Sequence, residues 1–231
     1  MSANIGQVRC NKIIHFRQSG DKTHPKIDNF ININVTSGTN SKWKKLSPMI
    51  LGPFNMEMKL FASNLYPNGI EPGYIRINDS YAIIKCTNLE NLWQGSKVYD
   101  IDLDKNDNIK PSFFERRLKM VIDVKPHRRA VPKSKGTTVF LFWENKRYLY
   151  LESRFIYCNI YSFLVQHTQE FRDLVDLHNN GTNLLILGYD GVDTEITEET
   201  MRYHYNDSSK PFGHELVICC LLCGFAPWIN N

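Results

Sequence analysis

The feature that most constrains the fold of this chain is its most apolar stretch, LVICCLLCGFAPWI, which runs from Leu216 to Ile229. The stretch is too short to span a bilayer, which takes roughly 20 apolar residues. It therefore predicts a buried helix, and such a helix needs a core around it. The chain has 231 residues, enough for one sizeable domain with a core or at most two small ones.

The composition and charge are those of an ordinary globular protein, with 42% hydrophobic and 23% charged residues. A net charge of +4 is too small by itself to indicate a nucleic-acid binder, but it permits an anionic ligand. The start of the chain, MSANIGQVRCNK, lacks the apolar core of a signal peptide, and no run reaches the length of a membrane span. We therefore expect a cytoplasmic protein that does not act at a membrane.

The cysteines indicate buried thiols rather than a metal site. Most of them lie in apolar neighbourhoods, which is typical of a protein from a reducing compartment. Cys220 and Cys223 form a C-x-x-C pair, but a zinc site needs a second ligand pair and the sequence holds none. We expect no metal and no cofactor. The six cysteines are Cys10, Cys86, Cys158, Cys219, Cys220 and Cys223.

Apolar periodicity divides the chain into strand-like and helix-like segments. It predicts one α+β domain over residues 46–231, with more helix than strand, preceded by a polar N-terminal extension over 1–45 that contains a short strand. Strands are expected over 30–35, 137–143, 147–155 and 183–191, with a turn at 144–146. An extended segment is expected over 47–54. A strand pair is expected around a loop at 67–69, with its second part over 74–86. Helices are expected over 88–99, 113–123, 161–167, 168–181 and 195–205, and from Leu216 onward.

The stretch NLENLWQGSKVY, Asn88 to Tyr99, carries the first candidate site. On a helix, Glu90, Gln94 and Lys97 would share one face, and Trp93 would lie at its border. A structural interpretation competes with the functional one. Thr87 to Glu90 fits the capping-box pattern, in which the glutamate caps the helix and the other polar residues are solvated surface.

Four further segments hold polar or charged side chains suited to ligands. SNLYPNG offers Asn64 and Tyr66 around a proline turn, and KPHRR is a dense cationic group. LGYDG places Asp190 in a tight turn, and FGHE places His214 and Glu215 at a helix start. Each also has an ordinary structural interpretation as a turn, a solvated loop or a cap. No Walker loop, dinucleotide-binding fingerprint, G-x-S-x-G or H-E-x-x-H is present.

SNLYPNG followed by NLENLWQGSKVY resembles the paired motif of the NADAR family, the YbiA-like N-glycosidases, and the style of the chain resembles phage or large-virus members. The resemblance covers about Phe61 to Tyr99. The family's closing Trp-Gly segment is not found cleanly; LLILGYDG and FGHE stand near its place. The resemblance implies hydrolysis, without a metal, of the bond between a ribose-type sugar and a nitrogen base. Family substrates include a riboflavin-pathway intermediate and ADP-ribosylated guanine in DNA.

The resemblance also implies roles for particular residues. The carboxylate of Glu90 would stabilise the cationic sugar or activate water, because breaking the bond builds oxocarbenium character. The other catalytic candidates are Lys97 and Asp190, and the expected substrate contacts are Asn64, Tyr66, Trp93, Gln94, Arg128 and Arg129, the two arginines facing phosphates.

Two other functions stay open at this point. The chain could be a binder that holds an ADP-ribose-like nucleotide without turning it over, which the departure from the closing motif favours. It could also be a viral structural protein that uses its aromatic residues, 12% of the chain, for assembly.

Overall fold

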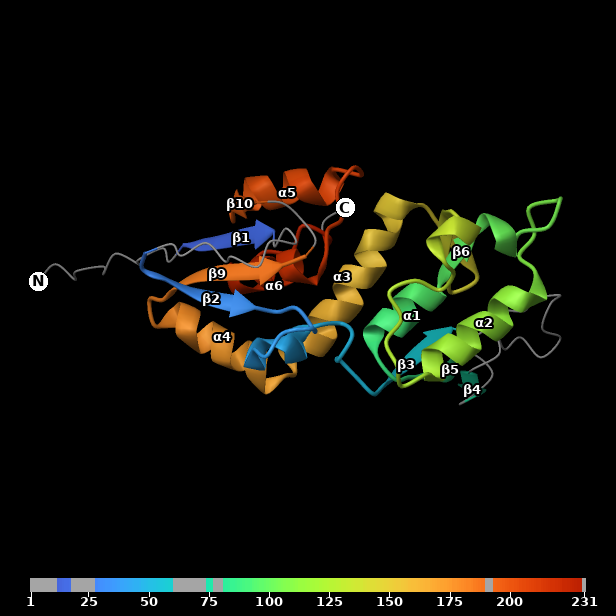
Figure 1. Ribbon diagram of the computed structural model, residues 1–231, viewed down its shortest axis with the longest axis horizontal. Coiled ribbons are helices and arrows are strands. Elements are labelled where there is room, and N and C mark those ends of the chain that lie inside the picture. The colour runs from blue at the N-terminus through green and yellow to red at the C-terminus, as the bar shows by residue number, and fades with distance from the viewer. Residues whose placement is uncertain (1–11, 18–27, 60–73, 77–80, 190–192, 230–231) are drawn as a thin grey trace, which may run out of the picture. The chain divides into compact units, whose positions relative to one another are not determined.

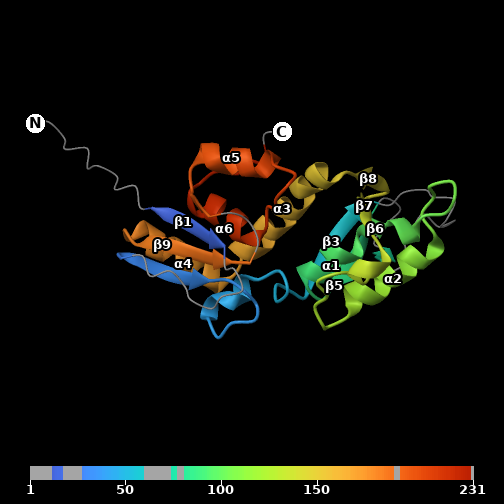
Figure 2. The ribbon, with the colours of Figure 1, turned by 45° about the horizontal axis from the view of Figure 1, so that its top comes forward.

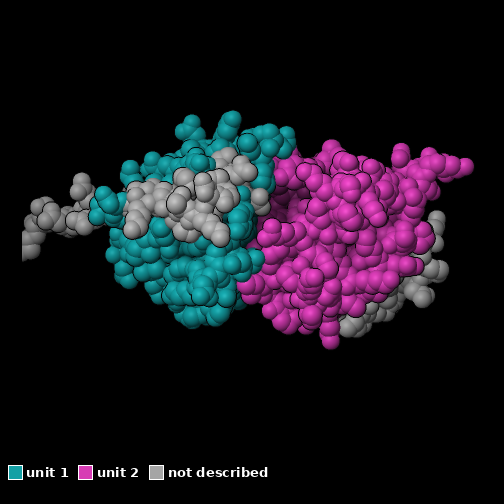
Figure 3. All heavy atoms as spheres, in the orientation of Figure 1, with its two compact units in different colours: residues 1–47, 162–231 teal, residues 48–161 magenta. Residues whose placement is uncertain are grey.

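The computed structural model describes residues 12–17, 28–59, 74–76, 81–189 and 193–229 (Figure 1). It confirms the α+β class, with more residues in helices than in strands. The chain forms two compact units where we expected one domain. Residues 1–47 and 162–231 make unit 1, and residues 48–161 make unit 2 (Figure 3). No helix within the described ranges is both long and apolar enough to cross a bilayer.

Unit 1 is built on a four-stranded sheet with the order β10-β1-β9-β2. Strand β9 pairs in parallel with both β1 and β2, so it lies between two strands that come far earlier in the chain (Figure 1). Its residues Leu184 to Leu187 are buried, which confirms the buried strand predicted there. The strands are β1 (Ile13–Arg17), β2 (Phe30–Asn34), β9 (Asn183–Gly188) and β10 (Thr194–Glu195).

The apolar stretch forms α6, which packs against β1 and β9. Figure 2 shows α6 between the sheet and α5. Residues 216–220 are all buried, so the expected buried helix is confirmed. The helix predicted over 168–181 also exists and stops before Gly181, whose φ of 90° suits a glycine after a helix end. The helical elements of unit 1 are η1 (Lys42–Leu46), α4 (Gln169–Asn179), α5 (Glu198–Asn206) and α6 (His214–Leu222).

Unit 2 contains two antiparallel sheets, with the orders β3-β5-β4 and β6-β7-β8. Helix α2 buries its apolar face in a cluster that includes Phe113, Phe114 and Phe142, whose ring centroids lie 4.9 to 5.9 Å apart. Helix α3 begins in unit 2 and ends in unit 1. The elements are β3 (Phe54–Lys59), β4 (Tyr74–Arg76), β5 (Tyr81–Cys86), α1 (Leu89–Gly95), β6 (Lys97–Tyr99), η2 (Asp100–Asp102), α2 (Pro111–Ile122), η3 (Lys133–Lys135), β7 (Thr138–Trp143), β8 (Lys146–Tyr148) and α3 (Tyr150–Gln166).

The strand expected over 147–155 is wrong in its second half. The turn is present, since Glu144 and Asn145 have φ of 44° and 58°, as a two-residue hairpin turn requires. Strand β8 ends at Tyr148, however, and α3 starts at Tyr150. The carboxylate of Glu152 accepts a hydrogen bond from Leu149 N at 2.8 Å. This bond closes the first turn of a helix, which short-range alternation alone did not reveal.

Two ion pairs join η1 to α4 within unit 1, and one of them predicts how the stability of the protein depends on pH. Lys45 Nζ lies 2.6 Å from Glu170 Oε1, and this hydrogen bond holds the pKa of Glu170 below its ordinary value. A depressed carboxyl pKa adds stability at neutral pH that is lost as the pH falls through the folded pKa. In urea unfolding, Lys45→Met should therefore be less stable than wild type at neutral pH, and the difference should shrink in acid.

The matched control for this pair is Lys44→Met, which removes the same charge from the same short helix. Lys44 makes no ion pair within the part of the chain that the structure describes. Its substitution should leave the pH dependence of stability as in wild type. An identical pH profile for Lys45→Met would contradict the assignment.

Candidate functional site

The start of α1 shows which residue caps this helix and whether Glu90 takes part in the cap. Asn88 is the N-cap, and its Oδ1 accepts a hydrogen bond from Asn91 N at 2.9 Å. The capping box expected from Thr87 to Glu90 is therefore wrong; the cap lies one residue later. The hydroxyl of Thr87 instead donates to Val121 O at 3.0 Å. Helix α1 is thus capped without the carboxylate of Glu90.

Glu90 and Gln94 are joined on one face of α1. Gln94 Nε2 donates a hydrogen bond to Glu90 Oε1 at 2.8 Å, across the four-residue spacing of a helix face. Gln94 is buried, whereas Glu90 is partly exposed. The amide therefore orients a carboxylate that solvent still reaches. This confirms the shared face expected for the two residues.

Trp93 of α1 forms a second pair with Lys97. Lys97 Nζ lies 5.4 Å from the centroid of the Trp93 ring, within cation–π range. The other neighbour of Trp93 is Tyr157 on α3, with ring centroids 4.9 Å apart. We call Glu90, Trp93, Gln94 and Lys97 the α1 cluster. Its members are a carboxylate, an amide, a large ring and an ammonium group.

Lys97 does not lie on the helix, as we had expected. Helix α1 ends at Gly95, and Lys97 begins β6, where it pairs with Leu141 of β7. Gly95 faces Arg117 of α2, and a Cβ added there would lie 3.6 Å from Arg117 Cγ. The chain turns at Ser96 because β6 completes a sheet with β7, a partner that lies far away in the sequence. Lys97 still reaches Trp93, but from a strand.

A buried asparagine beside the cluster holds the cationic segment KPHRR. Asn91 is fully buried, and its Nδ2 donates to Asp123 O at 2.8 Å and to Lys125 O at 3.0 Å. Its Oδ1 accepts from His127 N at 2.8 Å. The side chain of Asn91 therefore fixes the backbone of this segment against α1, next in sequence to Glu90.

This arrangement makes Asn91→Ala a strong test of the connection between α1 and the segment. The substitution removes three part-buried hydrogen bonds to the backbone of the segment, which should lower the free energy of unfolding by about 2–4 kcal/mol. Trypsin should also cut after Arg128 or Arg129 faster than in wild type. The control is Asn106→Ala at an exposed turn. Equal stability and equal cleavage of the two variants would contradict the clamp.

The two arginines of the segment differ in their surroundings. Arg129 Nη2 donates to Gly136 O at 3.3 Å, and its guanidinium lies 5.8 Å from the Tyr99 ring centroid. Arg128 is exposed. Asp123 and His127 form a pair at 2.6 Å, and this hydrogen bond lowers the pKa of Asp123. Both arginines are therefore exposed, and Arg129 is positioned by its contacts with Gly136 and Tyr99.

Three predicted site residues, Asn64, Tyr66 and Asp190, lie outside the described residues. The sequence interpretation also missed residues. The sequence pattern indicated only a helix start at Asn91 and a helix at Arg116 and Lys119, with no functional role. The spacing of Ser112, Arg116 and Lys119 by four and three could have indicated that α2 presents a polar face.

In unit 1 the structure brings Gly188 from the segment LGYDG against Glu215 from the segment FGHE. Glu215 is 1% exposed and lies against Gly188 at the end of β9. A Cβ built on Gly188 would lie 2.1 Å from Glu215 Cγ. His214 Nδ1 lies 3.2 Å from Glu215 Oε2. The glycine thus makes room for a buried carboxylate paired with an imidazole.

Several of the described thiols are buried and stay protonated at neutral pH. Burial raises the pKa of Cys86 to about 12 and that of Cys223 to about 11, so both stay protonated at neutral pH. Within the described ranges, no three His, Cys, Asp or Glu side chains gather in a way that could hold a metal ion.

Comparison with known proteins finds no relative of this chain. The chain matches no family model, no curated protein and no solved structure. The geometry of the α1 cluster and the resemblance of its residues to a family motif are therefore what indicate a function.

Proposed function

We propose that the chain is an N-glycosidase of the NADAR type, which hydrolyses the bond between a ribose-type sugar and a nitrogen base. The observation that carries the proposal is the hydrogen bond from Gln94 to Glu90, which holds a partly exposed carboxylate at the first turn of α1. The residues of the α1 cluster are the ones for which the motif resemblance implies catalytic and binding roles.

The proposed reaction uses Glu90 as its central group. The bond between the anomeric carbon and the base nitrogen breaks, and its electron pair leaves with the base. The sugar becomes cationic, and a nearby carboxylate stabilises that charge electrostatically. Water then adds to the anomeric carbon and gives up a proton to Glu90. The departing nitrogen of the base takes up one proton, so the products are a sugar hydroxyl and a base N–H, and the loss of the proton from Glu90 restores its carboxylate.

The other cluster members have supporting roles in this proposal. Gln94 orients the carboxylate of Glu90. The ring of Trp93 offers a stacking surface for a base or a sugar. Lys97 lies over that ring and attracts an anionic part of the substrate. Arg128 and Arg129 are proposed to meet phosphates, and Asn64, Tyr66 and Asp190 keep their proposed roles as ligand contacts and second carboxylate.

The proposed substrate is ADP-ribosylated guanine in DNA. The proposed location of the reaction is the cytoplasm, which is the host cytoplasm if the chain is viral. The first test is to incubate a guanine oligonucleotide that carries ADP-ribose with the protein and to separate the products by chromatography. Release of free ADP-ribose and unmodified oligonucleotide is the expected result. The absence of release from this substrate would reject the proposed substrate.

A second candidate is a binder that holds an ADP-ribose-like nucleotide without turnover. One observation favours it: the family's closing Trp-Gly segment is not found cleanly, and only LLILGYDG and FGHE stand near its place. Saturable ADP-ribose binding without any product from the modified oligonucleotide would support this candidate against the enzyme.

A further inference from the structure

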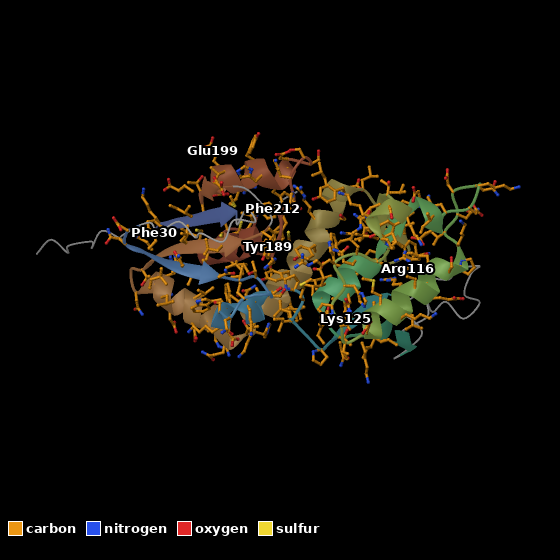
Figure 4. All side chains as sticks on the ribbon, viewed as in Figure 1. Phe30, Arg116, Lys125, Tyr189, Glu199 and Phe212 are labelled. Carbon is orange, nitrogen blue, oxygen red and sulfur yellow. The ribbon has the colours of Figure 1, made fainter. Side chains whose placement is uncertain are left out.

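A pocket of about 410 Å³ lies along α2 in unit 2, in addition to the α1 cluster. Its volume falls in the range of pockets that hold small molecules, roughly 300–1,000 Å³. One wall is the polar face of α2, and the other is the segment that Asn91 holds in place. Figure 4 shows Arg116 on α2 and Lys125 on the segment that follows it.

Cations dominate the polar lining of this pocket. Arg116, Lys119, His127 and Arg129 contribute basic side chains, and Glu115 and Asp123 contribute the acids. Asp123 shares a hydrogen bond with His127 at 2.6 Å, so one of its carboxylate oxygens already has a partner within the lining.

The two arginines are held by the same ring. The guanidinium of Arg116 lies 5.5 Å from the centroid of Tyr99, and that of Arg129 lies 5.8 Å from it. Arg116 is further fixed by Asp102 Oδ2 at 2.5 Å and by Lys97 O at 3.3 Å. Asp102 offsets the charge of Arg116, so Arg116 shapes the wall while Lys119 and Arg129 supply most of the attraction.

The charge of the whole chain supports an anionic ligand here. Unit 2 contains 17 lysines and arginines against 12 acidic residues, whereas unit 1 contains 11 against 12. The modest net charge of the whole chain therefore comes from unit 2, which is basic. Guanidinium groups match phosphate oxygens well, and Met120 and Ala130 add an apolar part to the wall that a sugar or a base can contact.

We propose that this pocket binds the phosphate groups of a nucleotide, free or within a nucleic acid. Glu90 is not among the lining residues. The inference rests on the proposed function only in the choice of adenosine diphosphate as the first probe. Lys119 and Arg129 are the main phosphate contacts, and His127 and Ser112 lie close enough in the lining to assist them.

Calorimetric titration tests the proposal with ADP, with adenosine and with a short oligodeoxythymidine. The pocket variant is Lys119→Ala with Arg129→Ala. The control is Lys105→Ala with Lys146→Ala, which removes the same charge from exposed positions of unit 2 outside the pocket. The pocket variant should bind ADP about tenfold more weakly or worse, while the control binds like wild type and adenosine binds poorly to all.

The outcomes separate the source of the phosphate. ADP binding that depends on Lys119 and Arg129 identifies a nucleotide pocket. Oligonucleotide binding alone, with the same dependence and weakened by salt, identifies a nucleic-acid backbone contact. Equal losses in the pocket variant and the control, adenosine binding as tight as ADP, or no binding of either phosphate ligand would overturn the proposal. Dependent binding without release of ADP-ribose would keep this inference and reject the proposed enzyme.

Discussion

Replacing Glu90 with glutamine is expected to lower the release of ADP-ribose by about 10²–10⁴-fold, the usual worth of a positioned acid or base. The fold should hardly change. The amide of a glutamine at this position can still accept the hydrogen bond from Gln94 Nε2, and Asn88 rather than Glu90 caps the helix. The favourable contact of a carboxylate with the helix start is lost, which is worth about 0.3–1 kcal/mol.

The matched control is Glu152→Gln, which removes a first-turn glutamate from another helix that starts in unit 2. It should lose a similar amount of stability and keep full turnover. Chromatography of the reaction products and urea unfolding of both variants provide the two measurements. If Glu90→Gln keeps turnover, the chemistry does not depend on this carboxylate. If it unfolds, its loss of turnover says nothing about catalysis, and Glu90→Asp then tests the role with the charge retained.

Gly188→Ala is expected to destabilise unit 1 by about 1–3 kcal/mol or more, because the new methyl group overpacks a filled site. The added Cβ would lie 2.1 Å from Glu215 Cγ and 2.4 Å from Glu215 Oε1. Glu215 is 1% exposed and lies near His214, so it has little room to move aside. Thermal and urea unfolding measure the loss directly.

Gly38→Ala is the control, because nothing lies within 4 Å of a Cβ at that position in the same unit. Gly188→Ala combined with Glu215→Ala gives a second check. Truncating Glu215 removes the colliding atoms, so the cost of Gly188→Ala should largely vanish in that background. Equal effects of Gly188→Ala and Gly38→Ala would show that the close contact is not present in solution.

Local patterns predicted the elements whose structure depends on short-range spacing. The alternation in Phe30 to Val35 and the three-four spacing from Phe113 onward both correspond to observed elements, β2 and α2. The end of α1 could not be predicted in this way. It depends on the pairing of β6 with β7 and on the approach of Gly95 to α2, both of which join residues far apart in sequence.

The same distinction applies to the candidate sites. Glu90, Trp93 and Gln94 could be grouped from sequence because helical spacing alone brings them to one face. The pocket along α2 could not be predicted, because Asn91 fixes its second wall through backbone contacts. The contact between Gly188 and Glu215 could not be predicted either, because it depends on the packing of α6 against β9.

The position of β9 between β1 and β2 has a consequence for the order in which a ribosome can complete this protein. Strands β1 and β2 emerge early, but they do not pair with each other; each pairs with β9. Unit 2 is one continuous segment, and all its residues emerge before β9 does. The sheet of unit 1 therefore has to wait through the whole synthesis of unit 2, and its two early strands need protection from wrong partners during that interval.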